Sequence, residues 1–152
     1  SLDMSASGPV QNDGDGKKRG VARQVANLSA GVRRSVFGAV CLAVFTIALL
    51  PGEPGEPSLI GWDKLSHIMA FIVLTVLLRA AWPAMTRRTG ALGLLTYGLA
   101  IELGQSLTGW GRTASLADLV ADLVGIGLGF VLLWSLAKLR AIQHAPPSSP
   151  SS

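Results

Sequence analysis

Apolar stretches and short polar segments alternate four times along this chain. The apolar stretches run from about 33 to 50, 65 to 82, 90 to 108 and 116 to 137. A helix rises 1.5 Å per residue, so stretches of this length approach or reach the roughly 30 Å thickness of a bilayer core. The pattern predicts an all-α protein built as a bundle of four transmembrane helices.

Polar segments flank the apolar region on both sides. The N-terminal segment, residues 1–31, begins with Ser1 to Gly20, which is rich in Gly, Ser, Asn and Asp and includes the basic run Lys17-Lys18-Arg19. The C-terminal segment, residues 141–152, is rich in Ser and Pro. Both compositions are typical of disordered tails, which leaves residues 32–140 as the membrane domain. A secretory signal peptide is the alternative interpretation of the first stretch, because Arg33 and Arg34 precede it; no convincing cleavage site follows it.

Composition narrows the class of protein further. The chain is 49% hydrophobic and 14% charged, with a mean hydropathy of +0.47, which is too apolar for an ordinary soluble domain. Its single cysteine, Cys41, lies in an apolar stretch and excludes an intrachain disulfide framework or a cysteine-based metal cluster.

The net charge of +4 would fit a nucleic-acid partner, but the positions of the basic residues indicate membrane orientation instead. Cytoplasmic loops of membrane proteins collect Lys and Arg. Eleven of the thirteen basic residues precede the first stretch, lie between the second and third, or follow the fourth: Lys17, Lys18, Arg19, Arg23, Arg33, Arg34, Arg79, Arg87, Arg88, Lys138 and Arg140. Only Lys64 and Arg112 lie elsewhere. We therefore expect both termini in the cytoplasm and no nucleic-acid partner.

The opposite, outward end of the predicted bundle carries the candidate functional residues. Helical spacing of three or four places the polar residues of each span on one face, and counting along each span brings them to a similar depth. Charged groups inside a membrane normally face a protein interior or a wet cavity. The predicted ligand-binding residues of this polar cleft are Asp63, Lys64, His67, Glu102, Gln105, Arg112, Ser115, Asp118 and Asp122.

Structural roles compete with functional ones at several of these positions. Ser115 and Asp118 fit a capping box that opens the fourth span, and His67 or Gln105 can serve as a structural hydrogen-bonding group. Glu102 and Asp122 lie deeper in their spans, which favours a functional role. The Gly125-x-x-x-Gly129 pair predicts close approach of a neighbouring helix.

Three segments, 62–71, 102–105 and 111–125, together resemble the VanZ-like family of small bacterial membrane proteins. The motifs D-K-x-x-H, E-x-x-Q, G-R-x-x-S-x-x-D and A-x-x-x-G occur in this order on the expected spans, and the resemblance covers roughly 36 to 137. It implies an inner-membrane protein whose founding relative is associated with resistance to teicoplanin. It also implies that the predicted cleft residues match the family's polar positions, except that Asp122 stands where the family usually has Asn.

Three functional hypotheses remain open. In the first, the cleft binds an envelope lipid precursor or a lipoglycopeptide, with Lys64 and Arg112 contacting its anionic groups. In the second, the protein is a membrane-embedded hydrolase or transferase acting on an envelope lipid head group, with His67, oriented by Asp63, and Glu102 or Asp122 as its acid–base groups. In the third, it is a structural subunit of a membrane complex.

No cofactor is expected from the sequence. A metal is not expected either, because the spacing matches no recognised metal motif, although His67, Glu102, Asp118 and Asp122 are residue types that can ligate one. The oligomeric state and the identity of the ligand stay open.

Overall fold

The computed structural model describes residues 13–51, 61–109 and 115–144, and within these ranges every regular element is an α-helix. The four helices are α1 (Asp13–Leu49), α2 (Trp62–Ala81), α3 (Arg87–Thr108) and α4 (Leu116–Gln143). The prediction of an all-α fold is confirmed for these parts of the chain.

Local sequence explains several helix ends. α2 ends just before Pro83, with Trp82 as its C-cap residue. Proline lacks an N–H group and disfavours a helical conformation in the residue before it. The hydroxyl oxygen of Thr86 caps α3 by accepting a hydrogen bond from the Thr89 N–H at 3.2 Å. α3 ends at Gly109, whose φ of 63° lies in the left-handed region that favours glycine.

The first helix is longer than the sequence predicted. Residues 1–31 were expected to form a disordered tail, but α1 begins at Asp13, so this prediction is wrong for residues 13–31. Extending an existing helix costs little compared with nucleating one, and the apolar stretch that follows provides the nucleus. At the other end α4 includes residues 141–143, and residues 1–12 and 145–152 lie outside the described ranges.

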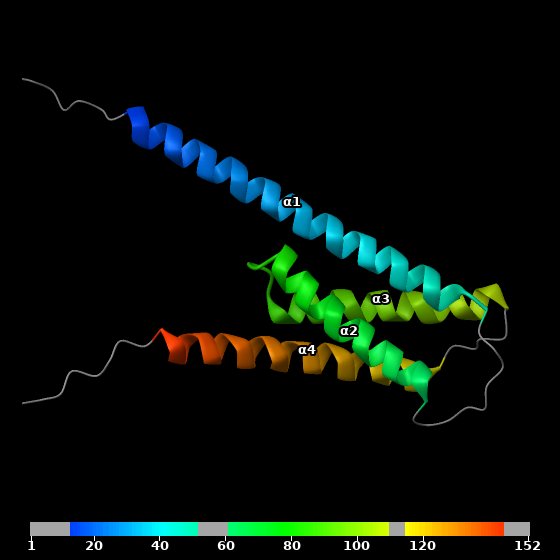
Figure 1. Cartoon of the computed structure of the whole chain (residues 1–152). Coiled ribbons are helices and arrows are strands. Elements are labelled where there is room, and N and C mark those ends of the chain that lie inside the picture. Colours follow the sequence, from blue (N-terminus) through cyan, green and yellow to red (C-terminus); the bar gives the residue numbers. More distant parts are fainter. Residues whose placement is uncertain (1–12, 52–60, 110–114, 145–152) are drawn as a thin grey trace, which may run out of the picture.

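The central helix of the bundle is α2, which contacts the other three and packs most extensively against α4 (Figure 1). Two glycines of α4 allow this close approach, as the Gly-x-x-x-Gly spacing predicted. A Cβ atom on Gly125 would lie 2.6 Å from the Ile68 carbonyl oxygen, and one on Gly129 would lie 2.6 Å from Cβ of Thr75. Both positions are therefore restricted to glycine by the backbone of α2 and its side chains.

The apolar core lies where α2, α3 and α4 meet. Phe71, Leu74 and Ile101 are almost completely buried there. α1 is attached to this core by the Tyr97 hydroxyl, which donates a hydrogen bond to the Cys41 carbonyl oxygen, and by an edge-to-face contact between Phe37 and Trp82 with ring centroids 5.5 Å apart.

Polarity in the bundle is reversed relative to a soluble protein. Large apolar side chains on the outer faces are exposed, for example Leu42 at 68%, Leu92 at 64% and Leu116 at 79%. Among the residues that the structure describes, six buried ones are polar: His67, Thr75, Glu102, Gln105, Asp118 and Asp122. An apolar exterior around a partly polar interior is the arrangement that a lipid environment favours.

Three of the described helices contain segments that are long and apolar enough to cross a membrane: Ser29–Leu49, Trp62–Ala81 and Leu116–Gln143. The sequence predicted four such spans. α3 forms as predicted, but glycines, threonines, Glu102 and Gln105 interrupt its apolar residues. Its composition is therefore less apolar than that of the three segments named above.

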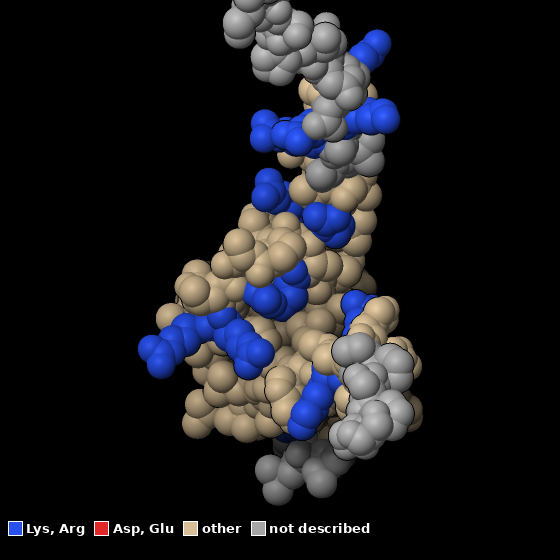
Figure 2. Space-filling model, turned by 90° about the vertical axis from the view of Figure 1, so that its left-hand side faces the viewer, with Lys and Arg blue, Asp and Glu red and all other residues tan. Residues whose placement is uncertain are grey.

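Positive charge gathers at one end of the bundle. The N-terminal half of α1, the connection between α2 and α3, and the C-terminal end of α4 lie at this end, on the left of Figure 1. Figure 2 looks onto this end and shows Lys and Arg side chains distributed over it, with no acidic side chain visible among the described residues. The alternation of basic segments along the chain thus becomes a basic end in three dimensions.

Candidate functional site

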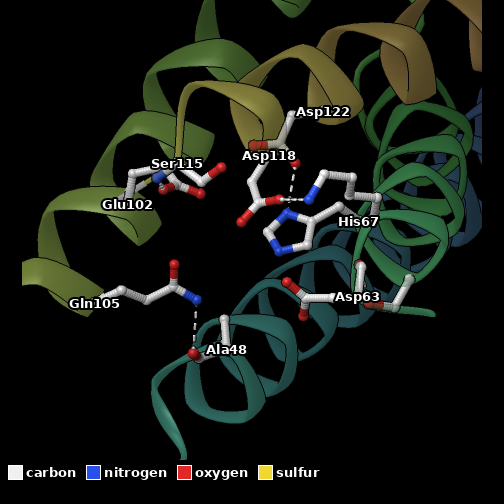
Figure 3. Close-up of polar contacts among 10 residues, drawn as sticks. Ala48, Asp63, His67, Glu102, Gln105, Ser115, Asp118 and Asp122 are labelled. Atoms are coloured by element: carbon white, nitrogen blue, oxygen red, sulfur yellow. Dashed lines mark hydrogen bonds and ion pairs between the residues drawn. The ribbon is translucent and has the colours of Figure 1, made fainter. Parts of the chain in front are cut away.

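The end of the bundle opposite the basic one holds a cluster of polar side chains. These side chains come from the start of α2, the end of α3 and the start of α4, and Figure 3 shows them turned toward a common space. Three helices therefore bring their polar faces together, as helical periodicity and depth predicted. The partners within the cluster, however, differ in part from those expected.

His67 and Asp122 form the most deeply buried pair of the cluster. Nδ1 of His67 lies 2.8 Å from Oδ1 of Asp122, and the two residues are 8% and 0% exposed. The sequence assigned the orienting role to Asp63, one turn before His67 on the same helix. The structure assigns that role to Asp122 of α4, because the close packing at Gly125 carries α4 against this face of α2.

Gly98 of α3 makes room for the Asp122 carboxylate, a role the sequence analysis missed. A Cβ atom at position 98 would lie 2.5 Å from Oδ2 of Asp122 and 3.2 Å from the Phe71 ring. Gly98 precedes Glu102 by four residues and so shares its helix face, which is the signal that could have revealed it. Asp122 is thus held between His67 on one side and the α3 backbone on the other.

Lys64 and Asp118 form an ion pair nearer the surface. Nζ of Lys64 lies 3.5 Å from Oδ1 of Asp118, with the two side chains 21% and 9% exposed. The pair links the first turn of α2 to the first turn of α4. Asp118 also lies in the first turn of α4, where the helix dipole favours an acidic group. It therefore contributes to the stability of this helix in addition to any functional role.

Glu102 contacts the start of α4 directly. Its Oε2 accepts a hydrogen bond of 2.7 Å from the backbone N–H of Ser115. Ser115 is the N-cap residue of α4, but its side chain makes no capping hydrogen bond, so the predicted capping box does not form. A carboxylate from α3 instead satisfies one of the free N–H groups near the start of this helix.

Gln105 serves a contact with α1. Its Nε2 donates a hydrogen bond of 2.8 Å to the carbonyl oxygen of Ala48, in the last turn of that helix. The last carbonyl groups of a helix lack partners within the helix, and the buried amide supplies one. The Gln105 amide nitrogen is thus engaged in joining α3 to α1.

Asp63 is exposed and lines a small cavity. This cavity has a volume of about 220 Å³ and is lined by Asp63, Ser66 and His67 together with apolar residues of α1, α2 and α3. One ligand atom each from Asp63, His67 and Asp118 lies within 4.8 Å of the others. Arg112, the second cation predicted for the cleft, lies outside the described residues.

An apolar groove runs beside the polar cluster between the first halves of α2 and α4. It has a volume of about 900 Å³. Its lining is almost entirely apolar and includes Trp62, Leu65, Ile68, Leu116 and Val120, with Lys64 as the charged exception. Lys64 therefore borders the groove while it reaches Asp118 in the cluster.

Comparison with known proteins identifies the family. A family model described as VanZ/LLP1 matches residues 16–138, most of the chain. The chain belongs to the VanZ/LLP1 family. No curated protein matches it, and no solved structure matches it.

Membership in the VanZ/LLP1 family agrees with the helices and with the polar cluster. The matched residues include the three segments that are apolar and long enough to cross a membrane, apart from residues 139–143 at the end of α4. They also include every residue predicted for the cleft. The protein is thus a VanZ-like membrane protein, and the family resemblance drawn from the sequence motifs is confirmed.

Proposed function

We propose that this VanZ/LLP1 protein binds an amphiphilic envelope lipid precursor or a lipoglycopeptide at the outward end of its bundle, in the bacterial inner membrane. The observation that carries the proposal is the position of Lys64. Its side chain borders the apolar groove and also lies 3.5 Å from Asp118 in the polar cluster. An amphiphile placed there has its chain against apolar side chains and its head group beside a cation.

The groove supplies the binding site for an acyl or prenyl chain. Trp62 is 88% exposed and Leu116 is 79% exposed, and both line the groove between α2 and α4. Binding sites for small molecules are typically concave and mainly apolar, with a few polar groups that fix orientation. A groove open along the side of the bundle suits a ligand that arrives from the lipid phase.

The cluster supplies the recognition of a polar head. The Lys64 ammonium group suits phosphate or carboxylate oxygens. The neighbouring carboxylates suit hydroxyl and amide donors, which both glycopeptides and lipid-linked sugars carry. Because most basic residues lie at the other end of the protein, Lys64 and Arg112 are the two cations that the sequence places on this side.

The test compares ligand binding by matched variants in lipid nanodiscs. A labelled prenyl-phosphate lipid and a labelled lipoglycopeptide are the two probes. Lys64→Ala and Arg112→Ala should each weaken binding about tenfold, the loss of one charge-assisted contact. Lys138→Ala is the control, because Lys138 lies at the basic end and contacts Trp134.

A second pair of variants tests the groove itself. Val120→Trp places a large side chain in the groove, whereas Val131→Trp adds the same side chain to an exposed position further along α4. We expect Val120→Trp to reduce binding and Val131→Trp to leave it unchanged. Equal binding by wild type and by all the site variants would refute the proposal.

A second candidate function is hydrolysis or group transfer on an envelope lipid head group. The observation that favours it is the His67–Asp122 hydrogen bond, since a buried carboxylate on one ring nitrogen orients an imidazole for acid–base work. Release of phosphate or of the head group from a labelled lipid measures this activity. It should be lost in His67→Gln and retained in Ser135→Ala, where the changed hydroxyl only bonds its own helix.

A further inference from the structure

The strongest additional feature of the polar end is a set of ligand atoms placed for a metal ion. One atom each from Asp63, His67 and Asp118 lies within 4.8 Å of the other two. Ligand atoms bound to a zinc ion lie about 2.0–2.2 Å from it, so two of them are separated by up to about 4 Å. Small side-chain rotations therefore suffice to bring these three atoms onto one ion.

We infer that Asp63, His67 and Asp118 bind a divalent transition-metal ion such as Zn²⁺ or Mn²⁺. Imidazole and carboxylate together suit these ions, whereas Mg²⁺ and Ca²⁺ prefer oxygen ligands alone. No metal was expected from the sequence, because its spacing matches no recognised metal motif: two of the three ligands come from α2 and one from α4.

A second observation, independent of these three residues, concerns a buried carboxylate beside the same space. Glu102 is 4% exposed, and its Oε1 is buried with no hydrogen-bond partner among the described residues. Figure 3 shows Glu102 on the side of the space that faces Asp118 and His67. Buried charges in proteins are normally paired or bound to metals. A cation held by Asp118 would compensate this carboxylate too.

The surroundings of His67 match those of a metal ligand. Metal-binding histidines usually give their second ring nitrogen to a carboxylate or carbonyl group, which fixes the ring. Asp122 occupies that position on Nδ1 at 2.8 Å. Nε2 is then the nitrogen available to the ion, and the 220 Å³ cavity bordered by Asp63 and His67 gives room for water or a head-group oxygen on the ion.

Metal binding is measured on the whole chain, purified in detergent and freed of metal with a chelator. Titration with ZnCl₂ and separately with MnCl₂ should show one ion bound per chain. Asp63→Asn and Asp118→Asn should each weaken binding at least about tenfold, and Asp122→Asn, which changes only the support of His67, should weaken it while keeping one ion per chain. Ser66 lines the same cavity but is not one of the three proposed ligands, so Ser66→Ala should bind the ion as the wild type does.

Folding and specificity are controlled in the same experiment. Asp63 is exposed, so Asp63→Asn keeps the test available if Asp118→Asn does not fold, as judged by circular dichroism and gel filtration. In the Mn²⁺ form, electron spin resonance should show coupling to an imidazole nitrogen, and this coupling should disappear in His67→Gln. No bound ion in the folded wild type, or equal binding by Asp63→Asn and wild type, would overturn the inference.

The metal titration contains no lipid and no glycopeptide, so its result is separate from that of the ligand-binding test. If the protein binds the ion but neither amphiphile, the metal site is supported and the proposed function is refuted. If it binds an amphiphile but no ion, the proposed function is supported and the metal site is refuted.

Discussion

Oδ1 of Asp122 lies 2.8 Å from Nδ1 of His67, and this contact joins α4 to α2 through two residues that are 55 positions apart in the sequence. Asp122 is completely buried, so removing either partner leaves the other without its hydrogen bond in the bundle interior. The contact therefore couples the stability of the bundle to the orientation of the one histidine at its polar end.

We predict that His67 and Asp122 are energetically coupled. Removing one partner of a buried pair costs about 3–5 kcal/mol, whereas removing both often costs much less than the sum. His67→Phe and Asp122→Leu should each lower the free energy of unfolding by about this amount, and the double variant should lose less than the two added together. Equilibrium unfolding in detergent measures all three, and strictly additive losses would contradict the coupling.

Gly98 should tolerate no side chain. In Gly98→Ala the new Cβ would meet Oδ2 of Asp122 at 2.5 Å, so the carboxylate or α3 must move. We expect a loss of about 1–3 kcal/mol in unfolding free energy, typical of overpacking. Gly93→Ala is the control on the same helix, because nothing lies within 4 Å of its Cβ, and it should be neutral or stabilising.

The α2–α4 contact should depend on two glycines of α4 and not on the one between them. Gly125→Ala and Gly129→Ala place a Cβ atom 2.6 Å from α2, whereas Gly127 has open space. Lower melting temperatures are expected for the first two variants and an unchanged or higher one for Gly127→Ala. If all three behave alike, helix propensity and not helix packing determines the effect.

Gln105 should contribute to the docking of α1. Replacing it with leucine removes the hydrogen bond to the Ala48 carbonyl oxygen and should cost about 0.5–1.5 kcal/mol of unfolding free energy. Faster hydrogen exchange should appear in the last turn of α1. Ser106→Ala provides the comparison, since the Ser106 hydroxyl donates to the Glu102 and Leu103 carbonyl groups of its own helix, and the variant should leave α1 unaffected.

Both termini should lie in the cytoplasm. The basic end seen in Figure 2 unites the N-terminal half of α1 with the end of α4, and the positive-inside rule assigns such an end to the cytoplasmic side. Alkaline phosphatase fused after residue 143 should therefore be inactive, while the same enzyme inserted after Gly61 should be active. Activity from the fusion at residue 143 would reverse the orientation.

Much of the helical architecture was predictable from the chain alone. Apolar length and the helix-ending residues located α2 and α3 to within three residues and the start of α4 at Leu116, whereas α4 continues past the predicted end at 137 to Gln143. The beginning of α1 was not predictable in this way, because residues 13–31 are polar and become helical as an extension of the apolar stretch that follows them. The predicted number of four spans depended on counting the third stretch, which forms α3, whose buried Glu102 and Gln105 lower its apolar character.

The sequence by itself determined which residues share a helix face and which end of the bundle they occupy, because helical periodicity and rise are properties of each helix alone. Only the tertiary structure decided their partners. The pairing of His67 with Asp122 and not with Asp63, and of Glu102 with the Ser115 backbone, depends on how the helices are rotated and how closely they approach. Those quantities are set by packing at Gly98, Gly125 and Gly129. The spacing of the two glycines of α4 indicates a close approach, but it does not specify which helix approaches or which polar side chains then meet.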